Sequence, residues 1–367
     1  MKKALFLILT ILIACSVAAQ PRPHRGHHGP RHPRVERHHP RMDRHHPRMD
    51  RHHKWHRATP KAPEFLKKGY KIAILSPSSV PTDLSIIDKG AAAIRNWGFE
   101  VVEGKHARSN YHTYAGTPEE RVADIMWALR DPSIKAIMCS RGGYGSANCL
   151  NLLPVDTLRK YPKWFIGYSD ITGFLSAEVR AGNMGIHGNM CGYLAKTGGT
   201  DQLSLYLRDM LMGKMPRYEV PGNKYNKPGK ASGILIGGNM CVYGDIADTP
   251  FDFLDRAFID GRDIILFIEE VEEPYSRIDR MFQHLILRGA MDKIKALVVG
   301  RFDGCPTSRG YNSVFEFIDE YVRPYNIPVC YDFPAGHDES WNYPLIEGCP
   351  VTLDVAKDKV TMEFNIK

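Results

Sequence analysis

The sequence predicts an α/β protein with two domains: an N-terminal, mostly parallel sheet sandwiched by helices and a C-terminal mixed α/β domain. Three observations predict this class. The composition, 43% apolar and 25% charged over 367 residues, is that of a globular chain and excludes collagen-like, disordered and multi-span membrane proteins. From residue 61 onward, short apolar runs alternate with amphipathic stretches. After about residue 221 the pattern changes to glycine-rich apolar strands.

The N-terminal domain is expected over 61–215. Its short apolar runs predict strands, and the amphipathic stretches between them predict helices that bury one face. The predicted strands are 72–75, 100–103, 136–139, 164–166 and 185–187. The predicted helices are 84–97, 118–129 and 170–180. This alternation favours parallel strands joined by helices that cover the sheet.

The C-terminal domain is expected over 231–367, after a linker at 216–230. One amphipathic stretch predicts a helix at 277–288, with Ser276 as its N-cap and Gly289 just past its end. Apolar runs predict strands at 264–268, 296–299 and 351–353.

Residues 1–19 have the layout of a signal peptide. Two lysines precede an apolar run that is too short for a stable membrane anchor, and small residues end the stretch at Ala19. The run that ends in Cys15 also resembles a lipobox, in which Cys15 is lipidated and becomes the mature N-terminus. Cleavage after Ala19 is the preferred interpretation, because the apolar run before Cys15 is short. In either case we expect an exported protein of the periplasm or cell envelope.

Residues 20–60 are rich in histidine and arginine, and we expect them to form a disordered tether. Eleven of the 16 histidines lie at 21–57, and the heptad Arg-His-His-Pro-Arg-Met-Asp occurs at 37–43 and again at 44–50. Recurrent proline and few aliphatic residues leave too little apolar surface to offset the entropy of ordering. The composition favours a cationic spacer that contacts anionic envelope polymers. The alternative is that histidine pairs capture a divalent transition metal.

The formal net charge of +8 is concentrated in this tether. Residues 21–57 hold 11 basic and 3 acidic residues, whereas residues 58–367 hold 36 basic and 38 acidic ones. The folded part is therefore close to neutral, and we expect no nucleic acid as a partner.

The cysteines give no sign of a metal site. Seven follow Cys15 without a Cys-x-x-Cys spacing, and His-Glu-x-x-His is absent. We expect most of these cysteines to be small buried hydrophobic side chains. The spacing does not decide whether one disulfide forms. Neither a metal nor a cofactor is predicted.

Ser169 follows a predicted strand and precedes a predicted helix. A serine at such a turn is where a nucleophile elbow exposes its hydroxyl, next to helix amides that can stabilise an anion. The second glycine of the Gly-x-Ser-x-Gly pattern is missing, and Ser169 and Asp170 also suit ordinary helix caps.

A glycine-rich segment at 141–145 follows another predicted strand. Glycines let backbone amides approach a ligand closely, which suits a phosphate cradle or an oxyanion hole. The segment lacks the Lys-Ser/Thr of a P-loop and the spacing of a dinucleotide fingerprint, which argues against ATP and NAD.

Two further residues complete a candidate catalytic set. Glu269 ends the apolar run 264–268, where a carboxylate can orient a histidine, and His337 lies in a loop bounded by glycine and proline. The order Ser169, Glu269, His337 is one that a Ser-His-acid triad can adopt. His187 is a second candidate histidine, better suited to lining a pocket.

Six motifs follow one another along the chain. They are RGGYG at 141–145, FIGYSD at 165–170, GGN at 237–239, the segment 269–280, GRF at 300–302 and FPAGH at 333–337. Over about 70–353 this set resembles the LD-carboxypeptidase family, the murein tetrapeptide carboxypeptidases. The resemblance implies an N-terminal α/β domain, a C-terminal domain and an active site between them.

The resemblance also implies roles for individual residues. It places the nucleophile on Ser169, the triad acid on Glu269 and the triad base on His337. The implied oxyanion donors are the backbone amides of Gly142, Gly143 and Asp170. The implied substrate-binding residues are Arg141, Tyr144, His187 and Asn239. Asn189 and Glu270 depart from the proline and aspartate that many relatives have there, which bears on substrate preference.

The function implied is an exported serine carboxypeptidase that removes the terminal D-alanine from murein tetrapeptides through an acyl-enzyme at Ser169. Two alternatives stand beside it. One is a related hydrolase of peptide-nucleotide conjugates, and the other is a non-catalytic envelope or metal-binding protein built around the tether. A homodimer is left open.

Overall fold

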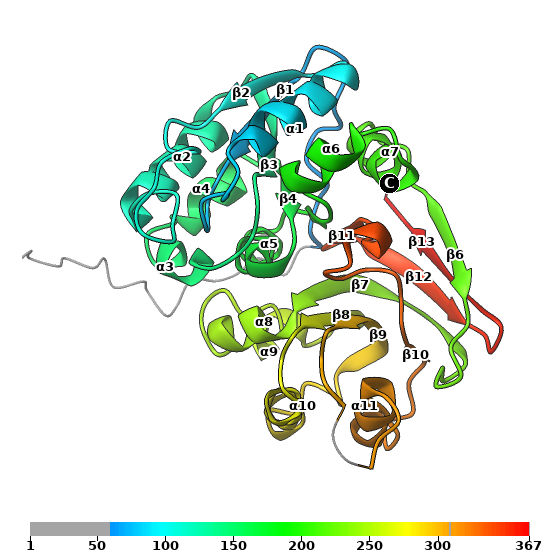
Figure 1. Ribbon diagram of the computed structural model, residues 1–367. Helices are drawn as coiled ribbons and strands as arrows, with labels where there is room; N and C mark the ends of the chain where they lie inside the picture. Colours follow the sequence, from blue (N-terminus) through cyan, green and yellow to red (C-terminus); the bar gives the residue numbers. More distant parts are fainter. Residues whose placement is uncertain (1–58, 308–309, 367) are drawn as a thin grey trace, which may run out of the picture. The chain divides into compact units, whose positions relative to one another are not determined.

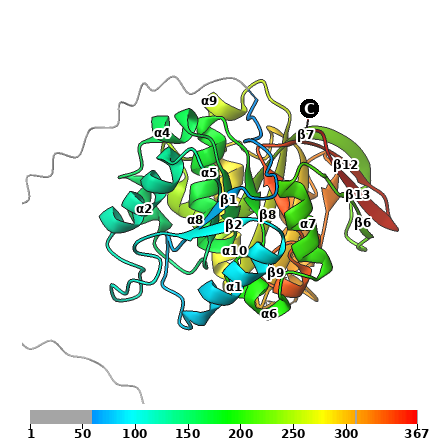
Figure 2. The ribbon, with the colours of Figure 1, turned by 90° about the horizontal axis from the view of Figure 1, so that it is seen from above.

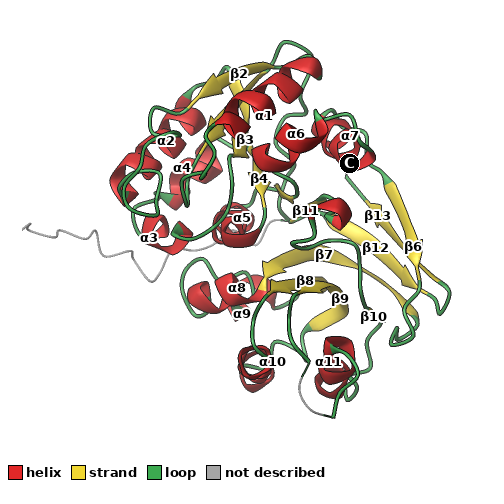
Figure 3. Cartoon of the chain, viewed as in Figure 1, coloured by secondary structure: helices red, strands yellow, loops and turns green. Residues whose placement is uncertain are grey.

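Figure 1 shows the computed structural model of the protein, which describes residues 59–307 and 310–366. These residues form two sheets with helices around them, as the cartoon in Figure 3 shows, so the predicted α/β class is confirmed. The predicted signal peptide, and the tether up to residue 58, lie outside the described residues. In the part of the chain that is described, no helix has the length and apolar character needed to span a membrane.

The first sheet has six strands in the order β11-β5-β4-β3-β1-β2, and only the β11–β5 pair is antiparallel. Its strands are β1 (Lys71–Leu75), β2 (Glu100–Glu103), β3 (Ile134–Cys139), β4 (Trp164–Gly167), β5 (Gly185–His187) and β11 (Leu345–Glu347). The first five coincide with the predicted strands to within two residues at each end.

Helices cover both faces of this sheet. Ile72 and Ile74 of β1 point into one apolar cluster, and Ala73 and Leu75 point into the other, because successive strand residues face opposite ways. The first face carries α1 (Ser85–Asn96), α6 (Cys191–Thr197) and α7 (Gln202–Leu211). The second carries α2 (Pro118–Arg130), α3 (Ser146–Leu150), α4 (Val155–Lys160) and α5 (Thr172–Ala181), the last preceded by the 3-10 helix η1 (Ser169–Ile171). Figure 2 shows α1 and α6 on the opposite side of β1 and β2 from α4 and α5.

The second sheet has seven strands in the order β10-β9-β8-β7-β12-β13-β6. Neighbours from β7 to β10 are parallel and the remaining pairs are antiparallel, so this sheet is mixed. Its strands are β6 (Arg217–Pro221), β7 (Gly229–Asn239), β8 (Ile264–Val271), β9 (Ile294–Asp303), β10 (Val329–Cys330), β12 (Pro350–Val355) and β13 (Lys359–Phe364).

The helices of this half are short except for α10. They are α8 (Met240–Ile246), α9 (Arg256–Ile259), α10 (Tyr275–Leu287) and α11 (Val314–Val322), with the 3-10 helix η2 (Glu339–Trp341). The prediction that Ser276 caps α10 is wrong, because the helix begins at Tyr275 after Pro274. Proline fixes a backbone angle that suits this position and needs no amide partner. Gly289 follows the end of the helix with a φ of +70°, as predicted.

Two strands lie outside the predicted plan of domains. The stretch 216–230, expected to be a linker, contains β6, which pairs with β13 as an edge strand of the second sheet. The C-terminal part of the chain also returns to the first sheet through β11, where Ile346 lies opposite Ile186. Each of the two apolar clusters contains residues of both halves: Phe174 of α5 and Ile236 of β7 belong to one, and Ile166 of β4 and Leu235 of β7 belong to the other.

All seven cysteines of the described residues have free thiols. Five are buried, in line with their interpretation as small hydrophobic side chains. Cys241 and Cys305 are partly buried.

Candidate active site

Ser169 lies at a sharp turn between β4 and α5. Its φ of +63° is in the left-handed region, which costs a residue other than glycine on the order of 1–3 kcal/mol. The chain leaves β4 at Gly167, passes Tyr168 and enters η1 at Ser169. Glycine is required at 167, because a Cβ there would lie 2.9 Å from the side chain of Ile171. A strained serine between a strand and a helix has the geometry of a nucleophile elbow.

The carboxylate of Asp170 fastens this turn to two neighbouring loops. Its Oδ2 accepts hydrogen bonds from the Ser78 hydroxyl at 2.5 Å and the Ser146 amide at 2.8 Å. Its Oδ1 accepts one from the Ser146 hydroxyl at 3.0 Å. Because Asp170 is buried, these bonds hold the segments that follow β1 and β3 against the serine turn.

The glycine loop, residues 141–145, lies against the serine. A Cβ on Gly142 would lie 3.0 Å from the Cβ of Ser169 and 3.3 Å from its Oγ. Gly143 has a φ of +99°, and a Cβ there would lie 2.4 Å from the Oγ of Ser79. Within the described residues, no hydrogen bond uses the backbone amide of Gly142 or Gly143. Unused amides beside a serine oxygen are what an oxyanion hole requires.

Glu269 and His337 form a buried hydrogen bond. The Nδ1 of His337 lies 2.7 Å from the Oε2 of Glu269, whose side chain is 0% exposed. Burial lowers the pKa of His337, but the Glu269 carboxylate outweighs that effect and raises the pKa above its ordinary value of 6.5. The Nε2 of His337 is buried and has no hydrogen-bond partner in the described part of the chain. This nitrogen is therefore left to accept a proton.

Strand β9 holds the loop that carries His337. A Cβ on Gly300 would lie 2.4 Å from the carbonyl oxygen of Ala335, and the Arg301 amide donates to that oxygen at 2.9 Å. The Oδ2 of Asp303 accepts a hydrogen bond from the His337 amide at 3.1 Å. The motif at 300–302 thus acts on the site by positioning the histidine loop.

Tyr168 brings the serine turn and the histidine loop together. Its ring centroid lies 5.3 Å from that of His337, in an edge-to-face arrangement at 74°. Because Tyr168 immediately precedes Ser169, this contact joins the strained serine turn to the imidazole. The serine turn follows β4, the carboxylate belongs to β8, and the histidine lies in the loop after β10. As a set they can perform nucleophilic catalysis.

Comparison with known proteins identifies two family domains in succession. Residues 72–188 match the LD-carboxypeptidase N-terminal domain, and residues 232–353 match the LD-carboxypeptidase C-terminal domain. The chain belongs to the LD-carboxypeptidase family. It is a carboxypeptidase of the serine type, as the motifs predicted.

Named relatives match most of the folded part of the chain. The murein tetrapeptide carboxypeptidase of Pseudomonas aeruginosa is 29% identical over 289 residues, covering 74% of this chain and 91% of that protein. A Bacillus subtilis protein named "Probable murein peptide carboxypeptidase" is 30% identical over 315 residues, covering 83% and 95%.

Solved structures share the fold. Muramoyltetrapeptide carboxypeptidase from Oxalobacter formigenes has a TM-score of 0.70 at 28% identity, covering 80% of this chain and 98% of that one. The microcin C7 self immunity protein has a TM-score of 0.70 at 22% identity, covering 84% of this chain and 100% of that one, a likeness that shows the fold alone.

In this LD-carboxypeptidase His187 lies beneath the site instead of lining it. Its ring is 0% exposed and packs between Tyr168, at 5.9 Å, and Phe267, at 5.0 Å. Burial lowers its pKa to about 4, so the imidazole is neutral at physiological pH. The prediction that His187 binds substrate disagrees with this placement. All three residues of β5 are buried, so this histidine belongs to a strand that is enclosed on both faces.

Asn239 also serves the scaffold of the LD-carboxypeptidase fold. Its Oδ1 accepts a hydrogen bond from the Val242 amide and caps α8, and its Nδ2 donates to Glu270 at 2.9 Å. Glu270 in turn accepts a hydrogen bond from the Cys241 amide at 2.8 Å. Burial and then the charge of Glu269 raise the pKa of Glu270 to about 7. Both polar atoms of the Asn239 side chain are used by these scaffold contacts, and its predicted contact with substrate stays a prediction.

Arg141 and Tyr144 flank the glycines of the loop and stay accessible. Arg141 is half-buried, and the Tyr144 ring is 58% exposed, 6.1 Å from the ring of Tyr114. Sequence reasoning did not single out Tyr168 or Asp303. The sequence does hold a signal for Asp303. This residue ends β9, and Glu269 lies near the end of β8. Neighbouring parallel strands place their carboxyl ends at the same edge of the sheet, so the two acids are expected on the same side.

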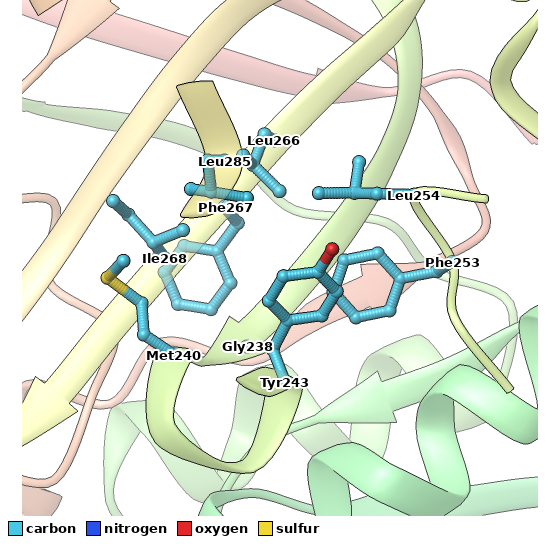
Figure 4. Close-up of a pocket in the computed structure, with 9 residues that line it drawn as sticks. All are labelled: Gly238, Met240, Tyr243, Phe253, Leu254, Leu266, Phe267, Ile268 and Leu285. Carbon is cyan, nitrogen blue, oxygen red and sulfur yellow. The ribbon is translucent and has the colours of Figure 1, made fainter. Parts of the chain in front are cut away.

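A small cavity beside β8 is a packing void. Its volume is about 10 Å³, which leaves room for about one water molecule. The lining is almost entirely apolar: Figure 4 shows a single oxygen, the Tyr243 hydroxyl, among the side chains drawn. The lining residues are Gly238, Met240, Tyr243, Phe253, Leu254, Leu266, Phe267, Ile268 and Leu285. Across the described residues, no group of three or more metal-ligating side chains is found.

Proposed function

We propose that this protein is an exported serine LD-carboxypeptidase that removes the terminal D-alanine from murein tetrapeptides. Membership of the family supports the class of reaction. The observation that carries the proposal is the buried 2.7 Å pair of Glu269 and His337 beside the strained turn at Ser169. In this proposal the three side chains take the roles of a Ser-His-acid triad.

Acylation begins when the Oγ of Ser169 attacks the carbonyl carbon of the L,D peptide bond. The Nε2 of His337 takes the hydroxyl proton, and the carbonyl oxygen becomes an oxyanion held by the amides of Gly142, Gly143 and Asp170. When the tetrahedral intermediate collapses, His337 returns the proton to the leaving nitrogen. Free D-alanine departs, and the tripeptide remains as an ester on Ser169.

Deacylation repeats these steps with water. His337 takes a proton from the water as its oxygen attacks the ester carbon, and it then returns that proton to the Oγ of Ser169. The tripeptide leaves with a new carboxylate. Throughout, Glu269 holds the Nδ1–H tautomer and stabilises the imidazolium, consistent with the raised pKa of His337.

The proposed substrate rests on relatives and on the expected location. The Pseudomonas aeruginosa relative and the Oxalobacter formigenes structure are named for murein tetrapeptide cleavage. The signal peptide predicted at 1–19 would deliver the enzyme to the compartment that contains the sacculus. In this proposal the tether at 20–60 contacts anionic envelope polymers and keeps the enzyme near its substrate.

The test is mass spectrometry of a disaccharide-tetrapeptide incubated with the full chain. We expect loss of one alanine with the unmodified protein and none with Ser169→Ala. Ser133→Ala, at an exposed turn between α2 and β3, is the matched serine control and should retain activity. Circular dichroism checks that each variant is folded.

The same assay separates the alternatives. Cleavage of a peptide-nucleotide conjugate but not of the tetrapeptide would favour the related hydrolase. Absence of hydrolysis of either compound by a folded protein would favour a non-catalytic envelope or metal-binding role. Alanine release that survives in Ser169→Ala would contradict the assigned nucleophile.

A further inference from the structure

A hollow of about 670 Å³ opens beside the glycine loop. It is lined by residues of the segments that follow β1 and β2 and by Arg141, which follows β3. The hollow thus lies at the carboxyl ends of three parallel strands, the edge at which open α/β sheets bind ligands. Its volume is within the range of about 300–1,000 Å³ that small-molecule sites occupy.

The hollow has basic side chains but no carboxylate in its lining. The titratable residues that line it are Arg108, His112 and Arg141. Arg108 is already compensated, because its guanidinium lies 2.6 Å from Asp88 and 2.6 Å from Glu103. The positive charge that remains available to a ligand in this hollow is therefore that of Arg141.

Arg141 has no ion-pair partner within the described residues. Its side chain donates one hydrogen bond, to the carbonyl oxygen of Val80 at 3.5 Å, the outer limit for such a bond. Its half-buried guanidinium offers a planar fork of hydrogen-bond donors. The preferred partner of such a fork is a carboxylate or a phosphate.

The charge of Arg141 is close to the proposed nucleophile. The Nε of Arg141 lies 3.7 Å from the position of a Cβ on Gly143. The next glycine, Gly142, would place its own Cβ 3.3 Å from the Oγ of Ser169. Burial raises the pKa of the Tyr168 hydroxyl, and the nearby charge of Arg141 opposes that shift. A peptide bound at Ser169 therefore has its flanking groups within reach of Arg141.

We propose that this hollow is a carboxylate-binding subsite, in which Arg141 pairs with a carboxylate of the peptide substrate. The inference rests on the proposed function and adds the group that is recognised. Two carboxylates lie near the scissile bond. One is the terminal carboxylate of the leaving D-alanine. The other is on the side chain of a diaminopimelate third residue, and a lysine third residue lacks it.

The test compares three tetrapeptides: the parent with diaminopimelate and a free terminus, its terminal amide, and its lysine analogue. We expect Arg141→Gln in the full chain to lower kcat/KM for the parent about ten- to hundredfold, the range of a lost charge-assisted pair. The variant should match the unmodified enzyme on the one analogue that lacks the paired carboxylate, which identifies the source. Arg141→Lys, with charge but no fork, should fall in between.

The matched control is Arg323→Gln. Arg323 is 68% exposed at the end of α11 and pairs with Asp319, so its loss should leave all three values unchanged. Equal losses on all three peptides in Arg141→Gln, or no loss on any, would overturn the subsite.

Calorimetric binding of the same peptides to Ser169→Ala gives a readout that needs no turnover. Adding Arg141→Gln should weaken binding of the parent by a similar factor and leave the uncharged analogue unaffected. If no peptide is cleaved but this Arg141-dependent binding persists, the proposed function fails and the subsite stands. If peptides are cleaved and binding is indifferent to Arg141, the subsite fails and the carboxypeptidase stands.

Discussion

Replacing Glu269 by glutamine should reduce turnover while preserving the fold. Glutamine has the same shape, but it removes the negative charge that lies 2.7 Å from the Nδ1 of His337. A hydrogen bond to a charged group contributes about 1.5–3 kcal/mol, so loss of the charge alone lowers kcat roughly ten- to hundredfold. The new amide can also donate to Nδ1 and select the wrong tautomer, which extends the loss towards about 10⁴-fold.

The same substitution should move the pH profile. The Glu269 carboxylate raises the pKa of His337 above 6.5, and the neutral imidazole is the active base, so activity rises as the pH passes that pKa. Without the carboxylate the effect of burial remains, and burial lowers the pKa of a histidine. The acidic limb of the profile should therefore shift to lower pH.

The assay is alanine release by mass spectrometry from about pH 5 to about pH 9. Glu270→Gln is the matched control, because Glu270 is the next residue of β8, is also buried, and bonds to the start of α8. We expect its kcat to stay within about threefold of the unmodified value. Equal losses in the two variants, or an acidic limb that moves to higher pH in Glu269→Gln, would refute the role of Glu269.

Three further predictions address the loop, the core and the N-terminus. Gly142→Ala should lower kcat at least about tenfold in the alanine-release assay, because the new Cβ would lie 3.0 Å from the Cβ of Ser169. Full activity would mean that the close approach of the glycine loop to Ser169 is dispensable. Burial raises the pKa of Glu178 from 4.5 to about 8, so the folded state retains a proton that the unfolded chain releases, and stability falls as pH rises between these values. Glu178→Gln should flatten that fall in urea unfolding, and an unchanged slope would contradict it. Intact mass of the protein from the cell envelope should show a chain that begins at Gln20, whereas a lipidated Cys15 or a retained Met1 would overturn the predicted cleavage.

Local sequence pattern is sufficient for the first five strands because each is a short apolar run closed by turn residues. β6 and β11 carry no such signal. β6 alternates exposed and buried residues at a sheet edge, and β11 has only three residues. Their partners lie more than a hundred residues away in sequence, as the pairs Tyr218–Met362 and Ile346–Ile186 show. Long-range pairing of this kind depends on tertiary packing and not on local propensity.

The candidate site divides in a similar way. Residue type and order allow Ser169, Glu269 and His337 to form a catalytic set, and the resemblance to the family was needed to choose them. They do not reveal the scaffold contacts of Asn239 and His187. An asparagine after two glycines suits a ligand contact and a helix cap equally well, and only the tertiary structure shows that its Oδ1 meets the Val242 amide at 3.1 Å.

The two adjacent acids of β8 show what selects the carboxylate that pairs with His337. Successive strand residues face opposite ways, so Glu269 shares a face with Phe267, whereas Glu270 shares one with Ile268 and bonds to α8. The run before them is apolar on both faces and does not indicate which acid meets His337.

Register decides the matter, because a slip of one residue would exchange the two acids. Gly237 helps to fix that register: β7 approaches β8 so closely that a Cβ on Gly237 would lie 1.7 Å from the carbonyl oxygen of Phe267. Two residues further along, Asn239 lies opposite Glu269. A side chain at 237 would force these strands apart and displace the carboxylate from His337. Gly237 therefore helps to place the Glu269 carboxylate against His337.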